Sequence, residues 1–317
     1  MSAKIENYEV LIAGQGAAAF AAGLYVARYQ MKSIIIGEIF GGETATGGLI
    51  ENYPGYADID GFDLMMKFRE QVSSYDVPIL DDKVNAIQKE SDFFKIQTES
   101  GTQYCATSVI LGIGRERRKL GLEHENEWIG KGVSFCSTCD APLHRNNIVA
   151  IVGGGNAAIE GAVLVAKYAS TVYLIYRRET FTRPDPVNLK LLNGSKNIIQ
   201  LLNTNVTSLN GTEGLSEISI DTPYNDSTNL AVDGLFIEIG ADPRIEIPIQ
   251  LGINLNEKNE VIVNTEMETN VGGVLAAGDL TDASGDLKQT VTAAAQGAIS
   301  AKSAYTYVSN KKVASVK

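Results

Sequence analysis

Residues 8–19 read YEVLIAGQGAAA, an apolar run that ends in the spacing Gly14-x-Gly16-x-x-Ala19. Residues 148–158 read IVAIVGGGNAA and repeat that spacing as Gly153-x-Gly155-x-x-Ala158. In this fingerprint the first glycine permits a tight strand-to-helix turn, the second leaves room for a pyrophosphate, and the small third residue lets helix and strand pack closely. One match alone is as consistent with a plain structural turn as with a ligand site. Two matches in the same context predict two dinucleotide sites.

Each copy of the fingerprint continues as a helix and a second apolar strand. Small residues predict helices to about Tyr29 and Tyr168, with the next strands at 33–38 and 171–176. Strands that are apolar throughout are typical of a parallel sheet buried on both faces. Three more elements are expected: strands at 103–107 and 108–114, and a final helix from about Gln289 to Tyr307.

Two abruptly polar stretches, at 115–119 and 240–244, interrupt this apolar pattern. We interpret them as the places where the chain crosses between domains. The predicted fold is α/β, with two Rossmann-like nucleotide-binding domains of three layers (ββα). Residues 1–115 and 244–317 form one domain, and residues 116–243 form a second domain that is inserted into the first.

The residues that end the second strand differ between the two copies. Glu38 in the first copy could accept a hydrogen bond from an adenosine ribose hydroxyl, or be a solvated loop carboxylate. In the second copy Tyr176 stands there, followed by Arg177 and Arg178, with Arg183 a further candidate. Arginines at this place attract the 2′-phosphate of NADP, which a carboxylate would repel; the alternative is an exposed basic loop.

Two features near the C-terminal end suit a flavin. Gly278 and Asp279 follow the apolar run 274–277, and a carboxylate at such a strand end could bind a sugar or ribityl hydroxyl. The final helix begins near Gln289, where its free amides and its dipole could stabilise negative charge on a flavin ring. Each feature alone would be only a strand end or a helix start.

Cys136 and Cys139 form a Cys-x-x-Cys pair about ten residues before the second apolar run. A structural zinc site needs four ligands, and the chain offers only one other cysteine, Cys105, and two histidines, so no metal is expected. Two thiols at this spacing can close a strained disulfide ring and exchange electrons. Asp140 is a candidate general acid, or else a cap for the following turn. Cys105 is expected to be an inert strand residue.

The bulk composition excludes several classes of partner. The net charge of −11 argues against nucleic acid and anionic membranes, because both carry negative phosphate. No run of about 20 apolar residues predicts a membrane span. The three cysteines fit a reducing compartment, so a cytoplasmic location is expected.

On these motifs the whole chain resembles the low-molecular-weight (class II) thioredoxin reductases of the pyridine nucleotide–disulfide oxidoreductase superfamily. The most specific segment is CSTCD at 136–140, followed by GGGN at 153–156 and Arg177-Arg178; ENYPG at 51–55 and AAGD at 276–279 also match. The resemblance implies a homodimeric enzyme that transfers electrons from NADPH through FAD and a Cys136/Cys139 disulfide to thioredoxin or a glutaredoxin-like dithiol protein. It also implies that the two domains alternate between two arrangements, with the polar crossings as hinges.

The resemblance assigns roles to individual residues. Cys139 would face the flavin, Cys136 would attack the protein substrate, and Asp140 would donate the proton. The residues implied in FAD binding are Gly14, Gly16, Ala17, Ala18, Glu38, Glu43, Gly48, Asn52, Gly114, Gly278, Asp279, Lys288, Gln289 and Thr290. Those implied in NADPH binding are Gly153, Gly155, Asn156, Ala157, Arg177, Arg178 and Arg183.

The sequence departs from the family pattern at four places. Glu43 replaces a common glutamine, and its charge is expected to lower the flavin potential. Ala141-Pro142-Leu143 replaces glycine and aromatics, Lys288 replaces an arginine, and Arg183 is shifted by one residue. Two other functions would fit the same fold: a flavin-dependent dithiol oxidase, which predicts a degraded nicotinamide site, and a non-catalytic flavin- or nucleotide-binding sensor, which predicts a lost dithiol.

Overall fold

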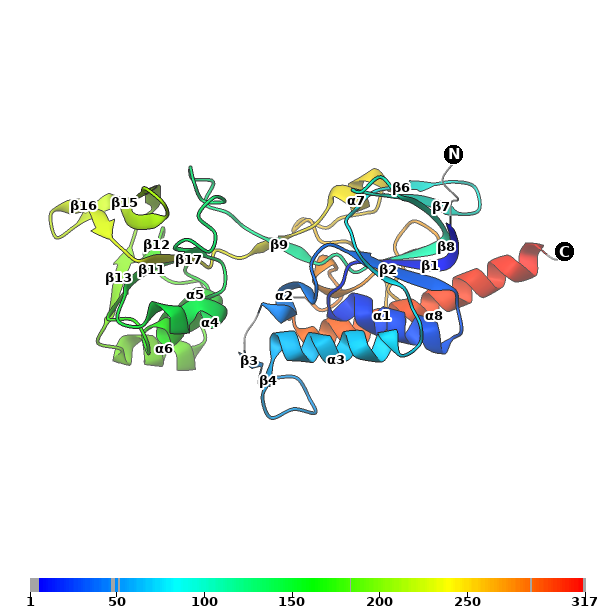
Figure 1. The fold of residues 1–317 in the computed structure, drawn as a ribbon, viewed down its shortest axis with the longest axis horizontal. Helices are drawn as coiled ribbons and strands as arrows, with labels where there is room; N and C mark the ends of the chain where they lie inside the picture. Colours follow the sequence, from blue (N-terminus) through cyan, green and yellow to red (C-terminus); the bar gives the residue numbers. More distant parts are fainter. Residues whose placement is uncertain (1–5, 47–48, 51, 183, 286, 316–317) are drawn as a thin grey trace. The chain divides into compact units, whose positions relative to one another are not determined.

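The computed structural model describes residues 6–46, 49–50, 52–182, 184–285 and 287–315. The chain divides into two compact units: unit 1 is Met1–Glu116 with Asp242–Lys317, and unit 2 is Arg117–Ala241 (Figure 1). Among the helices of the described ranges, none combines the length and the apolar character that crossing a bilayer requires.

Unit 1 is built on a seven-stranded sheet in the order β5-β2-β1-β8-β7-β6, with β19 paired to β8. The pairs that involve β1, β2, β5 and β19 are parallel, and β6-β7-β8 is an antiparallel meander. The strands are β1 Glu6–Ala13, β2 Ser33–Gly37, β5 Ile79–Asp81, β6 Val84–Lys89, β7 Phe94–Thr98, β8 Gln103–Leu111 and β19 Val274–Ala276.

The apolar strands of unit 1 are buried on both faces because side chains alternate along a strand. Val10 and Ile12 of β1 pack in one core with helices α1 and α8, and Leu11 packs in a second core on the opposite face. Burial of each such side chain contributes roughly 1.5–3 kcal/mol. The other elements of unit 1 are α1 Ala17–Arg28, α2 Gly42–Ala45, β3 Leu49–Ile50, β4 Ile59–Asp60, α3 Gly61–Ser73, α7 Glu246–Gln250, η2 Gly278–Leu280 and α8 Thr290–Ser315.

Helices α1 and α8 lie side by side on one face of this sheet (Figure 1). Their close approach depends on Gly297, where an added Cβ would lie 2.1 Å from the backbone oxygen of Ala18. Small residues along α1 are therefore a packing requirement and not only a helix preference.

Two sequence expectations for unit 1 were wrong in detail. The strands expected at 103–107 and 108–114 are one strand, β8, which ends at Leu111. The buried Ser108 hydroxyl donates to the Gly273 oxygen at 2.9 Å and so does not interrupt pairing. The last helix runs to Ser315 rather than Tyr307, since no glycine or proline ends it there.

Unit 2 has three layers. Its central sheet is parallel in the order β10-β17-β11-β12-β13, one face packs on helices, and the other packs on the antiparallel sheet β14-β15-β16. This is the predicted ββα layering, and the α/β fold class is confirmed. The elements are β10 Val133–Ser134, α4 Ser137–Asp140, η1 Ala141–His144, β11 Ile148–Val152, α5 Asn156–Val165, β12 Thr171–Tyr176, α6 Pro186–Gly194, β13 Ile198–Leu202, β14 Val206–Gly211, β15 Leu215–Tyr224, β16 Ser227–Ala231 and β17 Gly234–Ile237.

The two polar crossings are paired with each other. Strands β9, Arg115–Arg117, and β18, Ala241–Pro243, form a separate two-stranded sheet. The Arg118 amide donates to the Gly240 oxygen at 2.9 Å, and the Arg244 amide donates to the Gly114 oxygen at 3.1 Å. The chain therefore leaves unit 1 and returns to it through adjacent, antiparallel segments.

Candidate functional site

The turn from β1 to α1 has the geometry of an anion site. Gly14 has φ +116°, and a Cβ there would lie 2.2 Å from the Gly112 oxygen, so only glycine fits. Gly16 has no atom within 4 Å of its Cβ position, and as the N-cap of α1 it supplies no side chain to the first amides. The open space over Gly16 and the uncapped amides of Ala17 and Ala18 fit a pyrophosphate.

The turn from β11 to α5 repeats this geometry in unit 2. Gly153 has φ +153°, and a Cβ there would lie 2.2 Å from the Glu238 oxygen. Gly155 faces open space and is the N-cap of α5 without a side-chain cap. In both units the first glycine rests against the end of the neighbouring parallel strand, and the second glycine borders the space that a pyrophosphate would fill.

The loop after β12 is held against this second turn. A Cβ on Gly154 would lie 2.3 Å from the Tyr176 ring, the Tyr176 and Thr182 hydroxyls are 2.5 Å apart, and the Thr182 amide donates to the Gly154 oxygen at 2.8 Å. Arg177 and Arg178 are exposed, and no carboxylate of the described residues lies within ion-pair distance of either. Their charges are available to a phosphate. Arg183 lies outside the described residues.

Asn156, the first residue of α5, is already committed to protein contacts. Its amide nitrogen donates to Glu160 at 2.7 Å, and its oxygen accepts from the Asp185 amide and the Asn188 side chain, both at 3.1 Å. The side chain therefore ties α5 to α6. The neighbouring Ala157 adds only a methyl side chain to the start of α5.

Glu38 lies just beyond β2, as expected, and it is an exposed carboxylate that pairs with two cations. Its Oε1 is 2.5 Å from Arg244 Nη1, and its Oε2 is 3.7 Å from Lys83 Nζ. The nearby Gln15 side chain is 2% exposed; its nitrogen donates to the Gly37 oxygen at 2.7 Å and to Asp81 at 2.7 Å. Sequence reasoning missed Gln15 and Arg244, because no local motif marks them.

Two segments that are distant in sequence meet at the start of α8. Asn52 donates to the Gln289 side chain at 2.8 Å, and the hydroxyls of Thr44 and Thr290 are 3.0 Å apart. Glu43 belongs to the same short helix, α2, as Thr44. The structure thus brings together four of the residues predicted for FAD. Gly48 lies outside the described residues.

The Gly278–Leu280 turn completes this side of unit 1. Gly278 has φ +81°, and its Cβ position lies 3.1 Å from the Ala18 side chain of α1. The buried Gln296 side chain of α8 accepts from the Gly278 amide at 2.7 Å, a support that the sequence did not reveal. Burial raises the pKa of the Asp279 carboxyl, with an added contribution from Glu43, while Arg115 and Lys288 oppose the shift.

Lys288 lies in a cluster of charges beneath that turn. Its ammonium is 3.0 Å from Glu260 Oε1 and donates to the Thr281 oxygen, and Arg115 Nη2 is 2.8 Å from the same Glu260 oxygen. Arg115 Nε also donates to the backbone oxygen of Asp279 at 3.1 Å. Lys288 is thus an internal support of the Asp279 turn in this structure. Gly114, φ +64°, precedes Arg115 and borders open space.

The redox pair begins where β10 ends. Cys136 is disulfide-bonded, and its amide donates to Ser134 Oγ at 3.0 Å. Ser137, the first residue of α4, donates to Glu238 Oε1 from its amide at 3.2 Å and from its hydroxyl at 2.8 Å. Asp140 is the N-cap of η1 but makes no side-chain cap bond, so it does not serve as the turn cap considered above.

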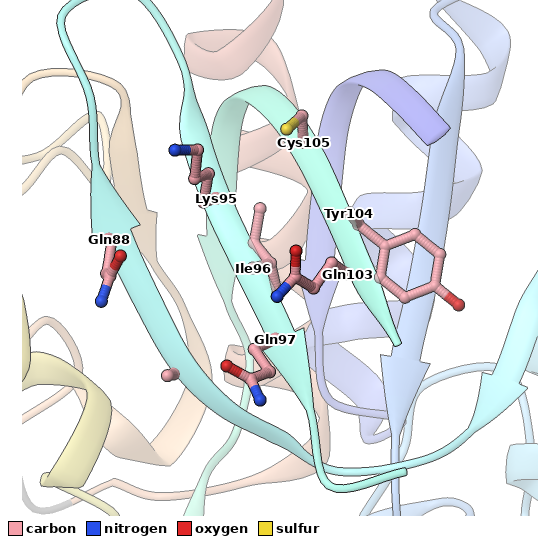
Figure 2. A pocket seen from close by; sticks show the side chains of 8 residues that line it. Gln88, Lys95, Ile96, Gln97, Gln103, Tyr104 and Cys105 are labelled. Atoms are coloured by element: carbon pink, nitrogen blue, oxygen red, sulfur yellow. The ribbon is translucent and has the colours of Figure 1, made fainter. Parts of the chain in front are cut away.

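The third cysteine lies in unit 1, in a shallow pocket on the outer face of the β6-β7-β8 meander. Figure 2 shows Gln88, Lys95, Gln103 and Cys105 on its lining. Cys105 is a free, buried thiol whose pKa is raised by burial. It is therefore a poor nucleophile, as expected for an inert strand residue.

Three comparisons identify the family. Residues 8–297 match the pyridine nucleotide-disulphide oxidoreductase family. The chain is 33% identical to thioredoxin reductase from Treponema pallidum (strain Nichols), over 95% of this chain and 97% of the relative, and 35% identical to that of Mycolicibacterium smegmatis, over 94% and 95%. The crystal structure of Lactococcus lactis thioredoxin reductase (FR conformation) superposes with a TM-score of 0.84 at 31% identity, covering 96% of this chain and 99% of the other. The chain therefore belongs to the pyridine nucleotide-disulphide oxidoreductase family.

Proposed function

We propose that this protein is an NADPH-dependent thioredoxin-disulfide reductase. The observation that carries the proposal is the disulfide-bonded Cys136, which lies in the same unit as an intact dinucleotide turn, while a second intact turn lies in unit 1. A degraded nicotinamide turn or a lost dithiol would have favoured the oxidase or the sensor. The thioredoxin reductases that match nearly the whole chain support the choice.

In this proposal unit 1 holds FAD and unit 2 holds NADPH. The open turn at Gly16, the Asn52–Gln289 pair and the Asp279 turn would hold the flavin nucleotide. The open turn at Gly155 and the exposed Arg177 would hold NADPH through its phosphates. When bound, FAD supplies the two-electron relay between nicotinamide and disulfide.

The thiol chemistry falls to three residues of unit 2. Cys139 is the proposed disulfide partner of Cys136, since the remaining cysteine, Cys105, is free. After the disulfide gains two electrons, the Cys136 thiolate attacks the substrate disulfide, and one substrate sulfur leaves with a proton supplied by Asp140. Cys139 then attacks Cys136, which releases the reduced substrate and restores the disulfide. NADPH, a proton and a disulfide thus yield NADP⁺ and a dithiol.

The decisive experiment adds NADPH anaerobically to the flavin-loaded protein and then adds oxidised thioredoxin. We expect rapid bleaching of the flavin, followed by its recovery as thioredoxin is reduced. Bleaching by substrate thiols with reoxidation by oxygen would instead favour the oxidase, and no bleaching by either would favour the sensor. A glutaredoxin-like protein in place of thioredoxin tests the alternative partner. The homodimer and the cytoplasmic location are parts of the same proposal, and sedimentation of the loaded protein tests the first.

Replacing Arg177 and Arg178 together with glutamine should raise the KM for NADPH at least about tenfold while changing that for NADH less than twofold. Two charge-assisted contacts to a 2′-phosphate are worth about 1.5–3 kcal/mol each, and NADH lacks that phosphate. Steady-state kinetics with both nucleotides measures the effect. The matched control is Lys167→Gln with Lys196→Gln, exposed residues that follow the C-terminal ends of α5 and α6 at the opposite edge of the sheet. Equal losses with both nucleotides would contradict the 2′-phosphate assignment.

Replacing Asp279 with asparagine should weaken flavin binding and stabilise the flavin-free protein. Burial raises the pKa of this carboxyl, so folding favours its protonated form. The resulting stability is fully present below the unfolded pKa and is lost as the pH rises through the folded pKa and the buried carboxyl ionises. The asparagine amide is neutral at every pH, so it avoids the destabilisation that ionising the buried carboxyl causes. At pH 7 the variant should therefore melt at a higher temperature than the parent. The difference should shrink as the pH falls and Asp279 is protonated. Thermal unfolding at several pH values tests this, and a lower melting temperature for the variant at pH 7 would refute it.

A further inference from the structure

Glu238 joins the redox helix to the sheet of unit 2. It follows the last residue of β17, at the carboxyl edge of the parallel strands. Its Oε1 accepts two hydrogen bonds from Ser137, at 3.2 Å from the amide and 2.8 Å from the hydroxyl. Because Ser137 is bonded to Cys136 and begins α4, this carboxylate fixes the backbone directly beside the redox sulfur.

Other segments of unit 2 close around the same carboxylate. Arg117 Nη1 lies 3.8 Å from Glu238 Oε2, and the Glu238 backbone oxygen lies against Gly153 of the dinucleotide turn. On α5, a Cβ at Gly161 would lie 2.6 Å from the Ser137 hydroxyl, so glycine is required there for the hydroxyl to reach Glu238. The carboxylate is only 11% exposed, so solvent screens its charge less than at an open surface.

A carboxylate in this place acts on the thiol that forms when the disulfide opens. A negative charge disfavours a nearby thiolate, which raises the thiol pKa and makes the dithiol a stronger reductant. Arg117 opposes this effect in part. The other ionisable groups on the elements packed against α4 are Asp140 on α4 itself, His144 on η1 and Glu160 on α5.

We propose that Glu238 is a positioning residue for the redox pair: through Ser137 it holds Cys136 in place, and through its charge it sets the thiol–disulfide equilibrium toward electron donation. The inference rests on the proposed role of Cys136 as the attacking thiol. It concerns a side chain outside the Cys-x-x-Cys segment, separated from Cys136 by about a hundred residues of sequence.

The test measures Cys136 directly, without NADPH or thioredoxin. In a Cys139→Ser background, the rate of alkylation of Cys136 by iodoacetamide is followed against pH, with the modified peptide identified by mass. Glu238→Gln keeps an acceptor for Ser137 and removes the charge. The midpoint of the pH profile of Cys136 alkylation should therefore move by about one pH unit toward acid. Ser137→Ala keeps the charge, and its midpoint should move by less than half as much. Asp226→Asn, a carboxylate-to-amide change at the exposed β15–β16 turn, should leave the midpoint in place.

A second measurement addresses placement. Ser137→Ala in the otherwise native enzyme should lower the rate of thioredoxin reduction about three- to tenfold, since it loses one of the two bonds that hold α4. A midpoint for Glu238→Gln that matches its parent, or that moves toward alkaline pH, would overturn the electrostatic role. An unchanged thioredoxin rate in Ser137→Ala would overturn the positioning role. Failure of the proposed function would instead appear as absent flavin bleaching, with the alkylation profiles unaffected.

Discussion

Replacement of Cys136 with serine should reduce the rate of thioredoxin reduction by at least about a thousandfold while leaving flavin reduction by NADPH within about twofold of the parent. Cys136 is disulfide-bonded and lies two residues after the end of β10, with its amide held by Ser134. A serine hydroxyl fits the same space but can neither form the disulfide nor attack one at neutral pH. The loss should therefore fall on kcat for the protein disulfide, and stopped-flow bleaching of the flavin by NADPH should be preserved.

The matched control for this substitution is Cys105→Ser. Cys105 is the one free thiol among the cysteines that the structure characterises, and burial raises its pKa, so its loss should leave turnover within about twofold. Persistent thioredoxin turnover in Cys136→Ser would show that the interchange assignment is wrong. A loss of turnover in Cys105→Ser would point to a role for the meander of unit 1.

Gly297→Ala should destabilise the protein by about 2–3 kcal/mol, the usual cost of overpacking a tight contact. A Cβ at this position would lie 2.1 Å from the Ala18 oxygen, which is backbone and cannot rotate away. The helices α1 and α8 would have to separate, and α1 begins at the pyrophosphate turn while α8 begins beside Gln289. We expect the midpoint of thermal unfolding to fall by about 5–10 °C and the flavin content of the purified protein to fall with it.

Gly194→Ala provides the comparison, because the chemical change is identical. Gly194 is the last residue of α6, and no atom lies within 4 Å of its Cβ position. Alanine should be neutral there or stabilise by up to about 1 kcal/mol, through the reduced entropy of the unfolded chain. Equal melting temperatures for the two variants would contradict the close contact of α1 with α8.

The fold class and the two turns were predictable because their signals are local. At Gly14 and Gly153 a positive φ and a neighbouring carbonyl oxygen exclude any side chain. Each turn therefore needs a glycine at that position, and the glycine spacing can be recognised in the sequence. The apolar runs of β1 and β11 predict buried parallel strands for the same reason, since both faces of each strand need apolar side chains.

The supports of the candidate site were not predictable, because they join segments that are distant in sequence. Glu38 is paired with Arg244, Gln296 holds the Gly278 turn, and Glu238 binds Ser137. Nothing in the residues around Glu238 marks it as a partner of the redox helix. Lys288 is a different case. The resemblance to the family predicts that it contacts FAD, and in the structure its ammonium is paired with Glu260.

The pairing of β9 with β18 has a consequence for how the chain folds during synthesis. Strand β19 joins the sheet of unit 1 only after all of Arg117–Ala241 has been made, so a contact between β8 and β19 closes a loop of more than a hundred residues. For an unstructured loop of that length the closure entropy costs about 4 kcal/mol. If unit 2 folds first, its two ends already meet at Arg118 and Gly240, and the long loop behaves as a short one. Once unit 2 has folded, the N-terminal and C-terminal parts of unit 1 can therefore pair through β8 and β19 at little cost in loop-closure entropy.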